Sequence, residues 1–178
     1  MKRIIRFFAE NVNKGHTSAG LRIKNIYTVE IPAMKAAFEA DGKKVGNIKQ
    51  LWHGTRTFNV LSILKSGLVV PKSAPGSTFA ITGRMFGDGL YFSDQSTKSL
   101  NYSQGFWDRT SPRDNKCFMF LADVAMGKEY TPSRPEQHIP RGYDSMLAKA
   151  GKSGVLNNEM VVYRLGQANL RYLIEFEG

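Results

Sequence analysis

The chain has 178 residues, 42% of them hydrophobic and 22% charged, which fits one compact domain with a sizeable core and excludes two full domains. Lysine and arginine number 25 against 15 aspartate and glutamate, and the formal net charge of +10 favours a polyanionic partner such as nucleic acid, or an anionic substrate. The single cysteine, Cys117, excludes an intramolecular disulfide and every multi-cysteine metal site.

The N-terminal residues predict a helix, because Ile4, Phe8 and Val12 recur at intervals of four. Asn13, Lys14 and Gly15 should end it. The apolar stretch is broken by Arg6 and stopped by Glu10, so it does not read as a signal peptide. We interpret residues 1–20 as a helical appendage of a single domain that spans residues 1–178.

The next elements alternate between strands and short helices. Residues 21–31 have the two-residue period of a half-buried strand, with Leu21, Ile23, Tyr27, Val29 and Ile31 on its apolar face. A short helix is expected over residues 32–40, with Pro32 at its first position and Gly42 beyond its end. A brief strand covers residues 51–53. A helix with an apolar face of Val60, Leu61, Ile63 and Leu64 then ends at Gly67.

The second half is richer in strands. Repeated Pro and Gly predict a long loop over residues 69–88, followed by a strand over 90–93 and a helix over 94–102 capped by Ser93 or Asp94. The apolar run 117–126 is typical of a strand buried on both faces, and strands are also expected at 159–164 and 170–176. This arrangement predicts an α+β fold with an antiparallel or mixed sheet and few helices, and excludes a doubly wound βαβ fold.

Several functional classes have no support in the sequence. No uncharged apolar run reaches the roughly 20 residues of a membrane span, and no phosphate-binding Gly-x-Gly-x-x-Gly or Walker loop is present. His16, His53 and His138 are too far apart for a helical zinc motif, so no metal site is predicted. Cys117 lies in an apolar run and is interpreted as a buried thiol. We expect a soluble, cytoplasmic protein of a reducing compartment with no membrane partner.

Three segments carry the functional signal: Leu51-Trp-His-Gly-Thr-Arg56, then Met85 to Asp94 with Lys98 to Tyr102, then Asn158-Glu-Met-Val-Val-Tyr163. In order and spacing they resemble the three signatures of the poly(ADP-ribose) polymerase-type ADP-ribosyltransferases, the class named for its His-Tyr-Glu triad. The resemblance covers about residues 20–178. It implies the ADP-ribosyltransferase fold, in which short sheets surround a cleft for NAD.

The resemblance implies that His53, Tyr91 and Glu159 are the catalytic residues. Cleavage of the bond between nicotinamide and ribose leaves an oxocarbenium-like sugar, and a carboxylate at Glu159 would place negative charge beside it. Glu159 could also help to take the proton of the acceptor. From composition alone, the simpler interpretation is a carboxylate at a strand end that pairs with a nearby Arg or Lys.

The resemblance also implies how NAD is bound. The backbone of Gly54 grips the nicotinamide amide with Ser99 as a second donor, Tyr91 and Tyr102 sandwich the ring, and the imidazole of His53 donates to a ribose hydroxyl. Thr55 and Asn59 match positions near the adenine-side ribose, and Lys98 matches a lysine beside the nicotinamide pocket. Taken singly, His53 and the tyrosines also fit ordinary hydrogen-bonded core positions. The complete set of expected NAD-binding residues is His53, Gly54, Thr55, Asn59, Gly67, Tyr91, Phe92, Ser93, Lys98, Ser99 and Tyr102.

Departures from the family pattern bear on the product. Val69 stands where a basic residue often contacts the adenine end, and Arg84 and Asn157 replace aromatic residues of polymer-forming members. We therefore expect transfer of single ADP-ribose units or short chains to a protein or nucleic-acid acceptor, with NAD as co-substrate and no metal. Two alternatives stay open: a NAD hydrolase, and a catalytically inactive basic module that binds nucleic acid or ADP-ribose.

Overall fold

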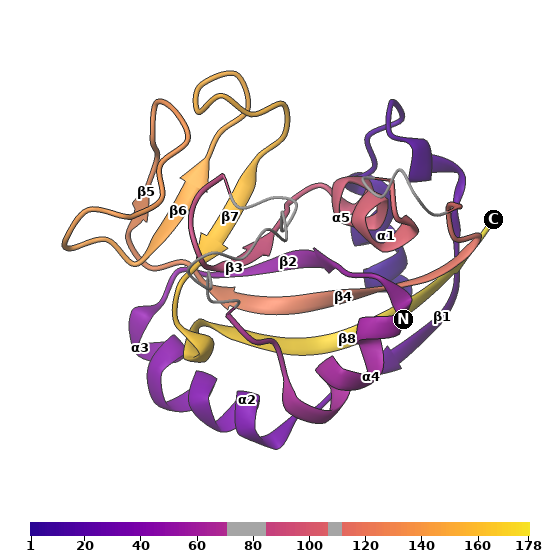
Figure 1. Ribbon diagram of the computed structural model, residues 1–178. Helices are drawn as coiled ribbons and strands as arrows, with labels where there is room; N and C mark the ends of the chain where they lie inside the picture. Colours follow the sequence, from indigo (N-terminus) through magenta and orange to yellow (C-terminus); the bar gives the residue numbers. More distant parts are fainter. Residues whose placement is uncertain (71–84, 107–111) are drawn as a thin grey trace.

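The computed structural model describes residues 1–70, 85–106 and 112–178, and within them the strands form two four-stranded sheets (Figure 1). The first sheet has the order β1-β8-β4-β2, and all its pairings are antiparallel. The second has the order β3-β7-β6-β5 and is mixed, since β5 pairs in parallel with β6. The strands are β1 (Arg22–Thr28), β2 (Ile48–Gly54), β3 (Leu90–Phe92), β4 (Lys116–Ala125), β5 (Glu129–Tyr130), β6 (Ser145–Ala148), β7 (Glu159–Val162) and β8 (Ala168–Glu177). The predicted α+β class with antiparallel and mixed sheets is confirmed.

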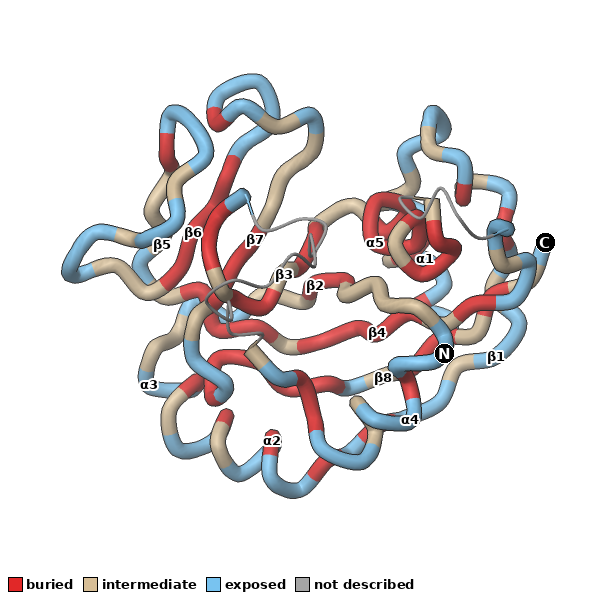
Figure 2. Tube along the Cα trace, viewed as in Figure 1, coloured by how far each residue is buried: buried red, intermediate tan, exposed pale blue. Residues whose placement is uncertain are grey.

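Strand β4 is buried on both faces, as its uninterrupted apolar sequence predicted (Figure 2). Cys117, Met119 and Leu121 pack into one hydrophobic cluster with helix α1. Phe120, Ala122 and Val124 belong to a second cluster on the opposite face, which includes residues of α2 and α4. Cys117 is fully buried, and burial raises the pKa of its thiol to about 12, as expected of a structural cysteine.

A short bridge joins the two sheets. The backbone N–H of Trp52, in β2, donates to the carbonyl of Ser93 (2.9 Å), and the N–H of Ser93 donates to the carbonyl of Trp52 (3.0 Å). Since Ser93 directly follows β3, this pair fixes the end of β2 beside β3. His53 and Tyr91, which the sequence separates by 38 positions, are thereby brought together.

The helices cover the first sheet. They are α1 (Lys2–Glu10), α2 (Pro32–Ala37), α3 (Lys43–Val45), α4 (Thr57–Ser66) and α5 (Ser96–Gln104), with 3₁₀ turns η1 (Thr17–Gly20) and η3 (Leu165–Gln167) and a π-helical turn η2 (Phe38–Gly42). In Figure 1, α2 lies below β8 and α3 lies to its left, whereas α1 and α5 lie above β4, on the other side of the sheet. No helix in the described part of the chain is both long and apolar enough to cross a membrane.

The predicted end of the helix at residues 32–40 was wrong. The helical chain continues through η2 and ends only at Val45. Gly42 lies inside this helical segment. Glycine is needed there because a Cβ would lie 2.5 Å from the carbonyl oxygen of Gly166. The glycine therefore marks a close approach to η3, and not a helix end.

Three further details differ from the predictions. A bulge between Ile23 and Asn25 shifts the register of β1, so that Tyr27 is exposed and Ile26 is partly buried. Leu61 is 79% exposed and lies off the buried face of α4. Helix α5 begins at Ser96, and its N-cap is Gln95; the expected cap residue Ser93 accepts a hydrogen bond from the N–H of Gln95 instead (3.0 Å).

Some elements lay beyond the predictions. Strands β5 and β6, of two and four residues, were not predicted. Most of the predicted loop over residues 69–88, including Arg84, lies outside the described residues. The N-terminal helix is present as predicted but ends at Glu10, before Val12, and it packs on the domain: the rings of Phe7 and Phe8 lie 5.3 and 5.9 Å from that of Trp52.

Candidate active site

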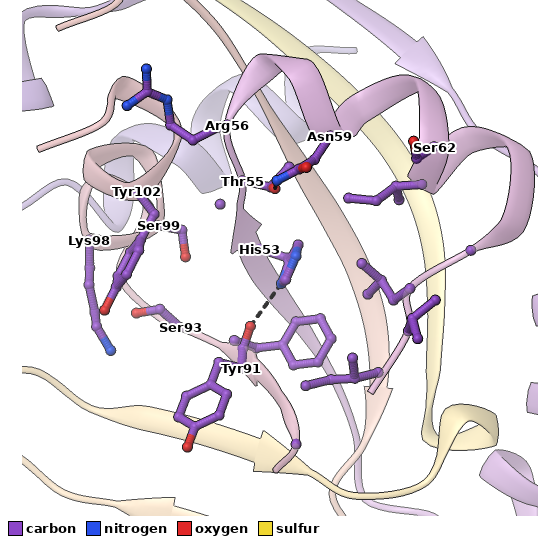
Figure 3. A pocket seen from close by; sticks show the side chains of 18 of the residues that line it. His53, Thr55, Arg56, Asn59, Ser62, Tyr91, Ser93, Lys98, Ser99 and Tyr102 are labelled. Carbon is purple, nitrogen blue, oxygen red and sulfur yellow. Dashed lines mark hydrogen bonds between the residues drawn. The ribbon is translucent and has the colours of Figure 1, made fainter. Parts of the chain in front are cut away.

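One cavity of about 800 Å³ opens between β2, β3, α4, α5 and the first residue of β7. Figure 3 shows Lys98, Ser99 and Tyr102 projecting from α5 on one side and Asn59 and Ser62 from α4 on the other, with His53 and Tyr91 between them. Every residue predicted for the site lines this cavity: His53, Gly54, Thr55, Asn59, Gly67, Tyr91, Phe92, Ser93, Lys98, Ser99, Tyr102 and Glu159.

His53 is oriented by the backbone of β3. Its Nδ1 lies 2.9 Å from the carbonyl oxygen of Tyr91, and because a carbonyl can only accept, Nδ1 carries the proton (Figure 3). Burial lowers the pKa of the imidazole, which is therefore neutral at pH 7. A neutral ring with its proton on Nδ1 presents Nε2 as an acceptor. A ribose hydroxyl would thus donate to His53, the reverse of the direction expected from the sequence.

Gly54 allows the end of β2 to touch the backbone of α5. A Cβ at this position would lie 1.8 Å from the carbonyl oxygen of Ser99, which no side chain can tolerate. The hydroxyl of Ser99 donates to the carbonyl of Trp52 (3.0 Å), so Ser99 offers lone pairs to the cavity. Donation by Ser99 to a carboxamide, as the sequence predicted, would require this hydroxyl to rotate.

Two tyrosines reach the cavity from different elements. The hydroxyl of Tyr91 donates to the carbonyl of Gly87 (2.9 Å) and accepts from the N–H of Phe86 (3.0 Å), which fixes the ring at its far end. Tyr102 comes from α5, and burial raises its pKa to about 12, so it remains protonated at neutral pH. The cavity therefore has two aromatic side chains on its wall, one from β3 and one from α5.

The charged centre of the cavity is the pair of Lys98 and Glu159. Lys98 Nζ lies 2.6 Å from Glu159 Oε1 and donates to the carbonyl of Asn158 at 2.9 Å. Both side chains are largely buried, at 10% and 16% exposure. Burial raises the pKa of Glu159, which Lys98 lowers only in part, and burial likewise lowers the pKa of Lys98 against the pull of Glu159. The simpler interpretation of Glu159 also holds here: it pairs with a lysine, but inside the cavity.

The other end of the cavity follows α4. The amide of Asn59 donates to the hydroxyl of Thr55 (3.1 Å), whose N–H donates to the hydroxyl of Ser103 (3.2 Å). Arg56 also lines the cavity and lies 3.5 Å from the carboxylate of Asp114. Phe58 also lines the cavity and was not predicted. Its side chain is 76% exposed, and it belongs to no apolar period, so its position shortly after the Trp-His-Gly-Thr motif was the only available signal.

Within the described ranges, no three His, Cys, Asp or Glu side chains come together in a group that could hold a metal ion. The three histidines lie on different parts of the fold. His53 faces the cavity, and His16 Nδ1 lies 2.9 Å from the hydroxyl of Thr97 on α5. The cavity brings together the imidazole of His53, two tyrosines, the ammonium of Lys98 and the carboxylate of Glu159.

Comparison with known proteins gives a consistent result. The family model described as the poly(ADP-ribose) polymerase catalytic domain matches residues 1–150. The chain is similar to poly [ADP-ribose] polymerase 1 of Gallus gallus, with 29% identity over 98% of this chain and 19% of that protein. It is also similar to poly [ADP-ribose] polymerase 2 of Homo sapiens (31% identity, 91% of this chain, 31% of that protein) and to poly [ADP-ribose] polymerase of Drosophila melanogaster (31%, 91% and 18%). The chain thus spans about a fifth to a third of the length of these relatives.

Proposed function

The chain belongs to the family of poly(ADP-ribose) polymerase catalytic domains, and from this premise we propose that it is an NAD-dependent ADP-ribosyltransferase. Membership of this family confirms the ADP-ribosyltransferase fold predicted from the sequence. The reaction cleaves the bond between nicotinamide and ribose and transfers ADP-ribose to a macromolecular acceptor, with release of nicotinamide. The observation that carries the proposal is the buried carboxylate of Glu159, held by Lys98 in a cavity that also receives His53 and two tyrosines.

Glu159 supplies the negative charge that the reaction needs. As nicotinamide leaves with the bonding electrons, positive charge develops on the ribose ring. A carboxylate fixed in a poorly solvated cavity stabilises that charge more than it could in water. We assign to Glu159 this stabilisation, a hydrogen bond from a ribose hydroxyl, and help in removing the proton of the acceptor.

Lys98 keeps Glu159 in the required state. Burial alone would favour the protonated, neutral carboxyl, and the ammonium 2.6 Å away opposes this. Lys98 also holds the carboxylate of Glu159 in place, because the ammonium is itself fixed by a second hydrogen bond, to the backbone carbonyl of Asn158. In this proposal Lys98 maintains the charge and the orientation of the catalytic carboxylate.

The remaining residues hold NAD. Tyr91 and Tyr102 bind the nicotinamide ring, Gly54 and Ser99 bind its carboxamide, and His53 Nε2 accepts from a ribose hydroxyl. Lining of the same cavity by these residues supports this assignment. Thr55 and Asn59, at the end of the cavity along α4, are assigned to the adenine-side ribose, and Gly67, Phe92 and Ser93 complete the wall. A ring that carries positive charge gains further from aromatic faces, which favours NAD over its reduced form.

The acceptor is a protein or a nucleic acid, and the net charge of +10 is consistent with a polyanionic one. Asn157, next to the catalytic segment, has no ring on which an ADP-ribose unit could stack, so the product is mono(ADP-ribose) or short chains. NAD hydrolysis shares the same cleavage step and differs only in having water as the acceptor.

The test is incubation of the protein with NAD labelled in its adenylate part, with and without added protein, RNA and DNA. Nicotinamide release together with label on a macromolecule supports the transferase. Release with all label in free ADP-ribose would make the hydrolase the better assignment. No release under any condition, from a protein that binds NAD, would contradict the proposal in favour of an inactive binding module.

A further inference from the structure

Asp94 lies between β3 and α5, behind the residues that line the cavity, and is not itself part of the lining. Its Oδ2 accepts a hydrogen bond from the side-chain amide of Asn158 at 2.7 Å. Its other oxygen, Oδ1, is buried and accepts no hydrogen bond within the described part of the chain. A buried carboxylate oxygen without a donor is costly, so its presence at this position calls for an explanation.

Asn158 connects Asp94 to the catalytic carboxylate. It is the residue directly before Glu159, and its side-chain oxygen accepts from the N–H of Ala150 (3.0 Å). Its backbone carbonyl accepts from Lys98 Nζ (2.9 Å), the same ammonium that holds Glu159. The start of β7 is therefore tied at Asn158 to three parts of the fold: the segment before α5, α5 itself and the segment after β6.

The negative charge of Asp94 also supports the pair of Lys98 and Glu159, because it favours the charged form of Lys98. The carboxylate of Asp94 raises the pKa of Lys98 and so opposes the effect of burial on the ammonium. Two nearby titratable groups respond to this pair: besides burial, Lys98 lowers the pKa of His16, on the N-terminal segment, and Glu159 raises the pKa of Tyr102, on α5. Burial lowers the pKa of His16 and raises that of Tyr102, so both are neutral at pH 7 and add no competing charge.

We propose that Asp94 is a positioning residue, which acts through Asn158 to hold Glu159 and Lys98 in their catalytic arrangement. The inference rests on the proposed function for its effect on rate. Its structural part does not, since it claims that the hydrogen bond between Asp94 and Asn158 fixes the start of β7. Asp94 itself touches neither NAD nor the acceptor in this proposal.

The experiment compares Asp94→Ala, Asp94→Asn, Asn158→Ala and the double variant Asp94→Ala/Asn158→Ala with the unaltered protein. Displacement of a catalytic group by about 1 Å costs on the order of a hundredfold in rate, so we expect kcat for nicotinamide release to fall between about tenfold and a hundredfold in Asp94→Ala. KM for NAD should change by less than about threefold, because no NAD contact is lost. The amide oxygen of Asp94→Asn can still accept from Asn158, so this variant should recover most of the lost kcat.

Two comparisons decide the mechanism. The double variant should be no slower than Asn158→Ala alone, because both changes break one link; additive losses would overturn the proposal. Equal loss of kcat in Asp94→Asn and Asp94→Ala would also overturn it, since the charge and not the hydrogen bond would then be responsible. Asp123→Ala is the matched control: this carboxylate pairs with Arg171 at 3.5 Å on the first sheet, outside the cavity, and its loss should leave kcat unchanged.

A second readout is independent of activity. The ammonium of Lys98, held by two acceptors, should give a resolved side-chain NMR signal that is lost or shifted in Asp94→Ala and restored in Asp94→Asn. If the unaltered protein releases no nicotinamide, the proposed function fails while this signal still decides the positioning. A Lys98 signal that is the same in all variants would contradict the positioning claim.

Discussion

Tyr102 is the residue on which the nicotinamide assignment can be tested most simply. Benzamide has the planar ring and carboxamide of nicotinamide and should compete with NAD for the same part of the cavity. Truncation in Tyr102→Ala removes an aromatic face, and we expect benzamide binding to weaken by roughly 1 to 3 kcal/mol. Competition assays at varied NAD give the inhibition constant. Failure of millimolar benzamide to compete in the unaltered protein would contradict this placement of the ring.

The pair of Lys98 and Glu159 makes a prediction about pH. Because the pKa of Glu159 is raised, its carboxylate takes up a proton, as pH falls, at a higher pH than a solvated glutamate does, and kcat should fall with it. Lys98→Met removes the charge that opposes burial, so the acidic limb of the kcat profile should move to still higher pH. Lys116→Met, at the exposed start of β4, is the control. An acidic limb that Lys98→Met leaves in place would show that the ammonium does not stabilise the catalytic carboxylate.

All the residues that the sequence predicted for the site line one cavity. They could be predicted because the segments around His53, Tyr91 and Glu159 resemble a family with ordered signatures. The sequence could not predict which group donates and which accepts in the hydrogen bonds of the site. That His53 donates to a carbonyl of β3, and that Ser99 donates to Trp52, depends on backbone positions that no side-chain pattern encodes.

At the scale of elements, the N-terminal segment holds the helix that carries Lys98, Ser99 and Tyr102. The N–H of Ser96, the first residue of α5, donates to the carbonyl of Asn11 (2.9 Å). The hydroxyl of Thr97 accepts from the N–H of Asn13 (2.9 Å) and contacts His16 Nδ1 at the same distance. Residues 1–20 thus support the wall of the cavity. Their interpretation as an appendage did not predict this role.

Thr97→Val tests this support with little change in shape. The variant leaves the N–H of Asn13 without its acceptor, and we expect the free energy of unfolding to fall by about 1 to 3 kcal/mol. Thr28→Val, at the exposed end of β1, is the matched control and should have little effect. Denaturant unfolding of both variants gives the comparison. Equal stability of Thr97→Val and the unaltered protein would show that these hydrogen bonds do not hold α5.

Element boundaries were predicted well where an uninterrupted apolar run marks a buried element and poorly where contacts with a distant segment decide them. Strand β4 was expected almost as observed because both its faces are covered. The bulge in β1 reversed the expected burial of Tyr27, and the contact of Gly42 with η3 hid the continuation of its helix to Val45. The bulge and the glycine contact each depend on a segment far away in the sequence, which the local hydrophobic period cannot reveal.

At the scale of the whole molecule, one prediction concerns the chain length of the product. We expect mono(ADP-ribose) or short chains, because Asn157 gives no stacking surface for a bound ADP-ribose unit. Gel analysis of products from labelled NAD, with mass spectrometry of the modified acceptor, measures chain length. A ladder of long polymer from the unaltered protein would contradict the prediction. Arg84, the other departure noted in the sequence, lies outside the described residues.

The central claim is that the carboxylate of Glu159 faces the developing charge on ribose, and Glu159→Gln tests it most directly. The amide keeps the shape and loses the charge, so turnover should fall by about a hundredfold or more while NAD affinity stays within a few-fold. Glu177→Gln, whose carboxylate lies 3.0 Å from Lys24 on the first sheet, should keep full activity. The decisive measurement is kcat for nicotinamide release set beside the dissociation constant for NAD. A folded Glu159→Gln protein with unchanged kcat would contradict the account.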